Sequence, residues 1–217
     1  MNAESYTLVI LHGWEHSKGQ WIALVDRFEP GKIVVLDLPG FGREALIDDT
    51  WGIPEYSEWV TRKVDGLGRM NIILLGHSFG GRIAGCIASK DPRWLKGLIL
   101  YGSPSLYRPS RKVKLKIGAA KFLKSLGFSK RAQGKMYPIF KRVVTFDQTK
   151  DLPNIKVPAL LIWGKEDSEV PLPIAKEMNG LISGSRLIII ENAGHNAHLD
   201  QPDLFYGTIK KFVGDLQ

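Results

Sequence analysis

The chain has 217 residues, of which 44% are hydrophobic and 24% are charged, the ordinary composition of a single soluble globular domain. No apolar run approaches the roughly 20 residues that a membrane-spanning helix needs, and no basic stretch precedes the first apolar run. We therefore expect neither a spanning helix nor a signal peptide. Cys86 is the only cysteine, which excludes an intrachain disulfide and favours a cytoplasmic protein with a buried thiol.

Charge is spread unevenly along the chain. The segment 107–151 contains thirteen Lys or Arg residues against Asp147 and Asp151, a balance of +11, so the remainder carries −3 of the total of +8. The basic character therefore belongs to one segment rather than to the whole protein. This segment has no recognisable nucleic-acid recognition motif, so nucleic acid is not expected as a partner.

Short apolar runs alternate with helical patterns along the chain. The expected buried strands are 6–11, 32–37, 71–75, 95–101, 159–163 and 186–190. The expected helices are 18–28, 54–67, the stretch after residue 78, 171–181 and 202–216. This alternation predicts an α/β fold, a doubly wound and mainly parallel sheet of about six strands with right-handed crossovers. Ligands bind such sheets at the carboxyl ends of the strands.

The stretch Gly76-His77-Ser78-Phe79-Gly80 fits the pattern Gly-x-Ser-x-Gly and lies between an expected strand and an expected helix. The helix then presents small residues, Gly81, Ala84, Gly85 and Ala88, which let it lie close to the sheet. In such a turn the two backbones approach too closely for a Cβ, so glycines flank the serine. The serine is strained and its hydroxyl is exposed, which makes Ser78 a candidate nucleophile.

With these features the chain resembles the α/β-hydrolase superfamily. The matching segments span nearly the whole chain: His12-Gly13, Asp37-Leu38-Pro39-Gly40-Phe41-Gly42, the serine turn, Gly164 to Asp167, and Gly194-His195-Asn196-Ala197-His198-Leu199-Asp200-Gln201-Pro202. The resemblance is specific for the fold and much less so for the substrate, because this fold carries many chemistries. A serine at position 78 argues against the relatives with an aspartate nucleophile, the haloalkane dehalogenases and epoxide hydrolases.

One departure from the family concerns the sheet edge. Members usually have an antiparallel strand pair before the first strand, and this chain starts too late for it, so the strand at 32–37 is expected at an edge. A bare apolar edge invites pairing, so we expect either the N-terminal residues or a second subunit to cover it. The protein is accordingly expected to be a monomer or a homodimer.

A serine nucleophile needs a base within hydrogen-bond reach and a third group that orients the base. His195 follows the last expected strand in a loop able to fold over the carboxyl edge of the sheet, and it is the expected base. His198 is the alternative, whereas His12 is expected to pack beneath the first turn and His77 to point away from the serine hydroxyl.

The resemblance implies an acid between the serine and the histidine, after a strand. Asp167 fits this position best, with Glu166 and Glu169 as its neighbours. Acyl transfer also needs N–H donors for the developing oxyanion. The expected donors are the backbone N–H groups of Phe79 and of Trp14, which follows a His-Gly turn like that of the family.

The basic segment stands where the family commonly inserts a helical cap. We expect a lid at 107–151 on a hydrolase core formed by 1–106 and 152–217. The lid is expected to contain one helix with Leu115, Ala119, Phe122 and Leu126 on its apolar face, and a second helix with Met136, Tyr137, Phe140 and Val144. The residues expected to bind substrate are Trp14, Phe79, Phe122, Met136, Tyr137 and Phe140.

The leading functional expectation is a serine hydrolase that cleaves a carboxylic ester or thioester through an acyl-enzyme on Ser78, without a metal or an organic cofactor. The alternatives are a C–C bond hydrolase with the same residues and a non-catalytic binding protein on the hydrolase scaffold. The lysines of the lid form either a solvated face or a docking surface for an anionic partner. Such a partner is an acyl carrier protein, an acidic membrane surface or a phosphorylated substrate.

Overall fold

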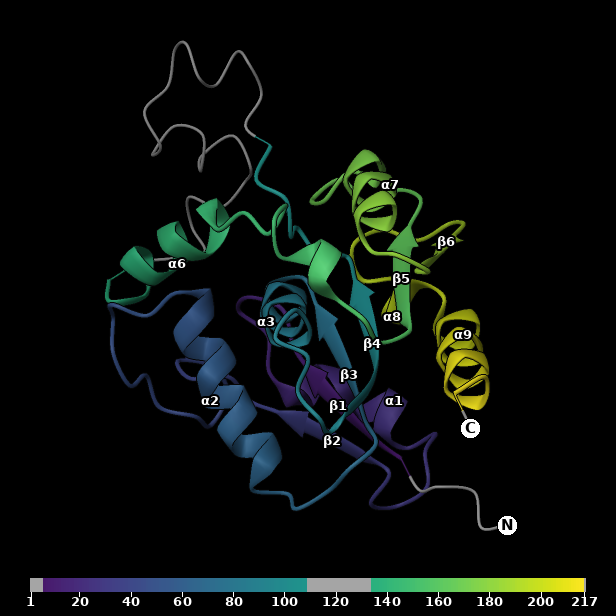
Figure 1. The fold of residues 1–217 in the computed structure, drawn as a ribbon, viewed down its shortest axis with the longest axis horizontal. Coiled ribbons are helices and arrows are strands. Elements are labelled where there is room, and N and C mark those ends of the chain that lie inside the picture. Colours follow the sequence, from purple (N-terminus) through teal and green to yellow (C-terminus); the bar gives the residue numbers. More distant parts are fainter. Residues whose placement is uncertain (1–5, 109–133, 217) are drawn as a thin grey trace.

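The computed structural model describes residues 6–108 and 134–216 (Figure 1). In this part of the chain, six strands form one sheet in the order β2-β1-β3-β4-β5-β6, and every neighbouring pair is parallel. The strands are β1 (Thr7–Leu11), β2 (Ile33–Leu36), β3 (Ile72–His77), β4 (Leu95–Tyr101), β5 (Ala159–Gly164) and β6 (Arg186–Ile190). The predicted fold class is confirmed, and β2 lies at an edge.

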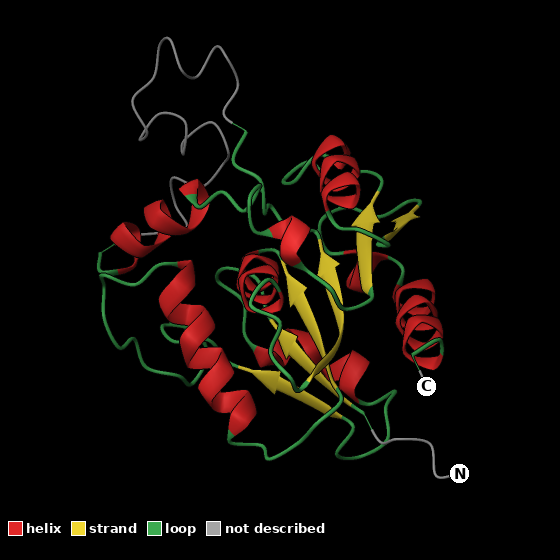
Figure 2. Ribbon diagram, viewed as in Figure 1, coloured by secondary structure: helices red, strands yellow, loops and turns green. Residues whose placement is uncertain are grey.

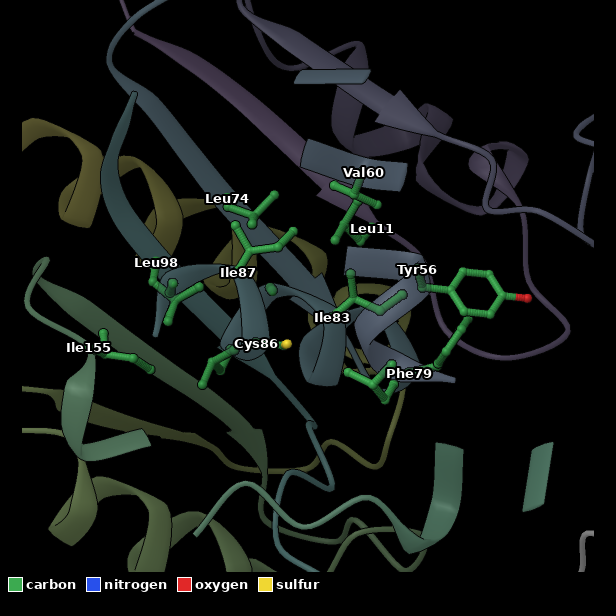
Figure 3. Close-up of a cluster of buried hydrophobic side chains, with 14 of the residues drawn as sticks. Leu11, Tyr56, Val60, Leu74, Phe79, Ile83, Cys86, Ile87, Leu98 and Ile155 are labelled. Carbon is green, nitrogen blue, oxygen red and sulfur yellow. The ribbon is translucent and has the colours of Figure 1, made fainter. Parts of the chain in front are cut away.

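The strands separate two apolar cores, one on each face of the sheet. Because successive side chains of a strand point to opposite faces, Ile72 and Leu74 belong to one core and Ile73 and Leu75 to the other. Both faces are covered, which is why the strands read as continuous apolar runs. Figure 3 shows part of the first core, which includes the thiol of Cys86, buried as predicted.

Helices cover both faces of the sheet (Figure 2). The first core is closed by α2 (Ile53–Asp65), α3 (Phe79–Ala88), α6 (Met136–Thr145) and α7 (Leu172–Leu181). The second is closed by α1 (Ile22–Val25), α8 (Ala197–Asp200) and α9 (Pro202–Gly214). Short 3₁₀ turns occur at η1 (Lys18–Trp21) and η3 (Leu152–Asn154). No helix in the described ranges is long and apolar enough to cross a membrane.

The first expected helix, 18–28, is shorter and broken in the structure. It becomes η1 followed by α1, with Trp21 at φ −102° and ψ 2° between them. The indole of Trp21 is fully buried and stacks on the ring of His198, with 4.6 Å between ring centroids. The contact between Trp21 and His198 thus overrides the helical spacing of apolar residues in 18–28, and the local sequence does not reveal this contact.

Between β4 and β5 the alternation of strands and helices is interrupted, as predicted. Within the described residues this interruption contains α6 and η3 (Figure 1). The expected helix around Phe122 lies outside the described residues.

Candidate active site

The serine turn connects β3 to α3. Ser78 has φ 50° and ψ −112°, a conformation that costs free energy in a non-glycine residue. A Cβ on Gly76 would collide with the carbonyl of Gly80, and a Cβ on Gly80 would collide with the carbonyl of Leu11 in β1. The two glycines are therefore required by the close approach of strand and helix, as the sequence predicts.

Asp167 and His195 meet at the carboxyl edge of the sheet. Oδ2 of Asp167 lies 2.8 Å from Nδ1 of His195, and both side chains are buried. The other carboxylate oxygen, Oδ1, accepts the backbone N–H groups of Glu169 and Val170 at 2.9 and 2.8 Å. These bonds hold the carboxylate in place while its second oxygen faces the imidazole, whereas the side chain of Glu166 is exposed.

The end of β4 lies between the serine and the imidazole. The backbone N–H of Ser78 donates to the carbonyl of Tyr101 at 2.9 Å. The next residue, Gly102, has φ +52°, and a Cβ on it would stand 3.1 Å from Cε1 of His195 and 3.5 Å from Oδ2 of Asp167. The three residues expected to carry the chemistry are thus gathered around one strand end.

Two buried donors hold the backbone of His195. The hydroxyl of Tyr101 donates to the His195 carbonyl at 2.8 Å, and Nε2 of His77 lies 3.1 Å from the same oxygen. The Tyr101 hydroxyl also lies 3.1 Å from Nδ1 of His198. The loop that carries the imidazole is therefore fixed to the ends of both β3 and β4.

The other buried histidines are neutral packing groups. Burial lowers the pKa of His12 and of His198 to about 4, and it lowers the pKa of the fully enclosed His77 well below its ordinary value. Nε2 of His12 accepts the backbone N–H of Leu38 at 3.0 Å, which ties the loop after β1 to the loop after β2. His12 thus packs at the turn after β1, as predicted, and Nε2 of His77 faces the His195 carbonyl.

A cavity of about 170 Å³ opens beside Ser78. Its other lining residues come from the segment after β4, from α3 and α6, and from α7 and the loop before it: Arg82, Pro104, Leu106, Tyr107, Arg108, Val144, Glu169, Val170, Pro171 and Ile174. A cavity of roughly 150 Å³ in another protein holds a benzene molecule, so this one has room for a group of about six carbons. The wall is mostly apolar.

Arg82 joins the helix after the serine to α6. Its guanidinium is buried and donates to the backbone carbonyls of Val144, at 3.2 Å, and Phe146. Burial lowers the pKa of this guanidinium to about 9, although the nearby carboxylate of Asp147 opposes the shift. The cation thus satisfies carbonyls at the carboxyl end of α6, where a helix favours positive charge.

Of the predicted substrate-binding residues, Trp14, Phe79 and Phe140 form an aromatic cluster at the start of α3, and none of these three belongs to the lining of the cavity beside Ser78. The Trp14 ring contacts Phe79 at 5.3 Å and Phe140 of α6 at 5.0 Å between centroids. Met136 is partly buried beside Gly40, and Tyr137 is 40% exposed. Phe122 lies outside the described residues.

Sequence reasoning missed Arg82 and Ile174 as neighbours of the serine, whereas Val144 lines the cavity from the second helix that was expected in segment 107–151. Arg82 left a signal, because it is a charged residue in a helix of otherwise small and apolar residues, four positions after Ser78. Ile174 left none, since it belongs to α7, which only the folded chain brings beside the serine. As for metals, no cluster of three or more His, Cys, Asp or Glu side chains that could hold an ion occurs in 6–108 and 134–216.

Comparison with known proteins decides the family. The family model described as "Alpha/beta hydrolase family" matches residues 8–208. The chain belongs to this family. It is therefore a hydrolase, and the resemblance drawn from the sequence is confirmed.

Individual relatives are distant but align over almost their whole length. The pimeloyl-[acyl-carrier protein] methyl ester esterase of Yersinia enterocolitica is 25% identical, over 95% of this chain and 92% of that protein. An esterase of Exiguobacterium antarcticum shares the fold with a TM-score of 0.81 at 21% identity, covering 96% of this chain and 92% of that one. MenH from S. aureus has a TM-score of 0.79 at 25% identity, covering 100% and 96%.

Proposed function

We propose that this hydrolase cleaves a carboxylic ester or thioester through an acyl-enzyme on Ser78. The observation that carries the proposal is the buried pair of Asp167 and His195, 2.8 Å apart, at the strand edge where Ser78 stands on its strained turn. In the proposed reaction His195 removes the serine proton, and Asp167 holds the imidazole and stabilises its charged form. The Ser78 oxygen attacks the acyl carbonyl, and the alcohol or thiol leaves with the proton from His195. Water, deprotonated by His195, then cleaves the acyl-enzyme and releases the carboxylic acid and free Ser78.

The proposed oxyanion donors are the backbone N–H groups of Phe79 and Trp14. Phe79 is the first residue of α3, and the N–H groups of a first helical turn have no partner within the helix. They also lie at the positive end of the helix dipole, which favours a developing negative charge. Trp14, Met136, Tyr137 and Phe140 are proposed to line the side of the site formed with α6.

The experiment is labelling with a fluorophosphonate probe, followed by a panel of nitrophenyl esters and matched thioesters of increasing acyl length. We expect the folded wild type to be labelled and to turn over at least one series, and Ser78→Ala to do neither. Labelling that survives in Ser78→Ala would overturn the assignment of the nucleophile. A labelled enzyme that cleaves none of the panel would instead favour C–C bond hydrolysis.

The acyl group is proposed to arrive on an acyl carrier protein. Support comes from the names of the curated relatives, such as the pimeloyl-[acyl-carrier protein] methyl ester esterase of Yersinia enterocolitica, and from the balance of +11 in segment 107–151. We propose this segment as a lid on the core formed by 1–106 and 152–217. Attraction between exposed charges is screened beyond about 10 Å at 0.1 M salt, so docking of an acidic carrier should depend steeply on salt.

Salt titration separates docking from chemistry. Hydrolysis of a carrier-borne ester should fall steeply with salt, while hydrolysis of a small neutral ester should not. The test variant replaces four lysines of the segment with glutamine: Lys114, Lys116, Lys121 and Lys124. The control removes four exposed lysines elsewhere: Lys90, Lys96, Lys176 and Lys210. If hydrolysis of the carrier-borne ester depends on salt equally in both variants, the lysines of the segment form only a solvated face and do not dock the carrier.

A further inference from the structure

Arg82 is a buried cation in the helix that begins at the proposed nucleophile. It lies about one helical turn after Ser78, in α3, whose residues are all buried. Only 3% of Arg82 is exposed. The hydrogen-bond partners of its guanidinium among the described residues are backbone carbonyls rather than carboxylates. A buried charge that is not neutralised by an ion pair lowers stability, so its presence indicates a role other than stability.

The guanidinium holds the last turn of α6. It donates to the carbonyl of Val144 at 3.2 Å and to the carbonyl of Phe146, directly after the helix ends. Carbonyls at a helix end have no partner within the helix, and one guanidinium can satisfy two of them. The backbone carbonyl of Arg82 accepts Nε2 of the buried Gln148 at 3.0 Å. Arg82 therefore fixes the end of α6, and the segment that follows it, to α3.

Further contacts of α6 run to loops. Phe140 packs against Trp14 in the loop after β1, with 5.0 Å between ring centroids. Arg142 donates to the carbonyl of Asp49, in the loop before α2, at 2.8 Å. Loops are usually more mobile than buried helices, so the link to α3 is the one that fixes α6 relative to the nucleophile.

One face of α6 forms a wall of the site. Val144 lines the cavity of about 170 Å³ beside Ser78, as does Arg82 itself. Phe140 lies one turn before Val144 on the same face of the helix. The guanidinium thus bonds the backbone of the residue whose side chain forms part of the cavity wall.

We propose that Arg82 is a positioning residue for substrate selectivity. Its hold on the end of α6 sets the place of the Val144 wall, and thereby the length of acyl group that the cavity accepts. This inference rests on the proposed function, since it concerns the acyl group of the ester, and it assigns Arg82 no step in the reaction. It also accounts for the choice of arginine, because a planar guanidinium offers two carbonyls donors from one side chain.

The experiment measures kcat/KM for nitrophenyl acetate and nitrophenyl hexanoate, and takes the ratio of hexanoate to acetate. Arg82→Met should lower this ratio about tenfold, because each methylene that loses its apolar contact weakens binding about fourfold. Arg82→Lys should give an intermediate ratio, since an ammonium group donates to carbonyls but lacks the planar fork. The control, Arg69→Met, removes another arginine that donates to a backbone carbonyl, that of Gly31, and should keep the wild-type ratio.

A double-variant cycle separates positioning from direct contact with the substrate. Val144→Ala removes the wall that Arg82 is proposed to place, and should itself lower the ratio. If Arg82 acts through this wall, adding Arg82→Met to Val144→Ala should lower the ratio less than about twofold further. The full tenfold loss in both backgrounds would mean that Arg82 acts independently of Val144, and would overturn the proposal.

Hydrogen exchange of backbone amides tests the link without a substrate. Amides in the last turn of α6 should exchange faster in Arg82→Met than in the wild type, but not in Arg69→Met, and unchanged exchange in Arg82→Met would overturn the proposal. Thermal unfolding checks that each variant is folded. If Arg82→Met does not fold, Arg82→Lys takes its place, with Arg69→Lys as control. A wild type that cleaves no ester refutes the proposed function, whereas an active wild type whose ratio is unchanged in Arg82→Met refutes only the role of Arg82.

Discussion

Gly102 offers the sharpest test of how tightly the site is built. It has φ +52°, and a Cβ there would stand 3.1 Å from Cε1 and 3.2 Å from Nδ1 of His195. Carbon atoms prefer about 3.5–4.0 Å, so Gly102→Ala must push the imidazole by a few tenths of an ångström away from its present place beside Asp167. The ring cannot yield freely, since its Nδ1 is held by the carboxylate at 2.8 Å.

The backbone strain of this variant has a matched control. Gly184 has φ +69°, and a Cβ on it would meet nothing within 4 Å. Alanine in this region costs about 1–2 kcal/mol relative to glycine, so Gly102→Ala and Gly184→Ala should lose similar stability in urea. Only Gly102→Ala changes the geometry of the base.

Catalysis should therefore separate the two variants. A misplacement of about 1 Å can cost a hundredfold in rate, so a few tenths of an ångström should lower kcat about threefold to tenfold in Gly102→Ala. KM for a small ester should change little, and Gly184→Ala should keep wild-type kcat. The assay is steady-state ester hydrolysis at the pH of maximal activity. Full activity in Gly102→Ala, or an equal loss in Gly184→Ala, would refute the reasoning.

Three further predictions follow from the same contacts. Tyr101→Phe removes the hydroxyl donor to the His195 carbonyl, so its kcat should fall about tenfold. The control, Tyr56→Phe, loses a buried 2.8 Å hydrogen bond to the Pro39 carbonyl, so both variants should lose about 0.5–1.5 kcal/mol of stability while only the control keeps wild-type kcat. Equal kcat in the two variants would contradict a positioning role for Tyr101. Asp167→Asn should keep the fold, as judged by circular dichroism, but lower kcat by about 10⁴, and a loss below tenfold would remove Asp167 from the mechanism. Acid should destabilise the protein, because the pKa of His12 and of His198 is lowered from 6.5 to about 4 in the folded state, so only the unfolded state gains protons between these values. The contribution of these two histidines to the free energy of unfolding is fully present above pH 6.5 and should fall by about 3 kcal/mol per histidine as the pH drops towards 4. Urea unfolding at several pH values measures this change. A urea midpoint that does not depend on pH would count against it.

Local sequence patterns were sufficient to predict those features of the fold and site that depend on short stretches of the chain. The strand at 95–101 is continuous and apolar because both faces of the sheet are covered, and its bounds agree with β4. The glycines around Ser78 predicted the close approach of β3 and α3. The family resemblance indicated Asp167 as the partner of His195, and the parallel sheet explains why the two meet, since both residues follow a strand and all carboxyl ends share one edge.

Contacts that depend on the path of the chain were beyond such patterns. The bond from Tyr101 to the His195 carbonyl joins residues 94 positions apart and requires knowing the depth at which the last loop crosses β4. Likewise, Ile174 lines the cavity beside Ser78 from α7, an element that follows β5 and lies 96 positions after the serine in the chain. The helix breaks at Trp21, whose indole stacks on the distant ring of His198. The spacing of apolar residues in 18–28 cannot reveal such a contact.

The interruption between β4 and β5 has a consequence for synthesis of the protein. Residues 102–158 separate the two strands, and at about 5–20 residues per second a ribosome needs about 3–11 seconds to pass them. Throughout that interval the first four strands are available, but the side of β4 that later pairs with β5 has no partner. Fourteen cationic side chains emerge during the same seconds, and their mutual repulsion opposes association between half-made chains until β5 arrives.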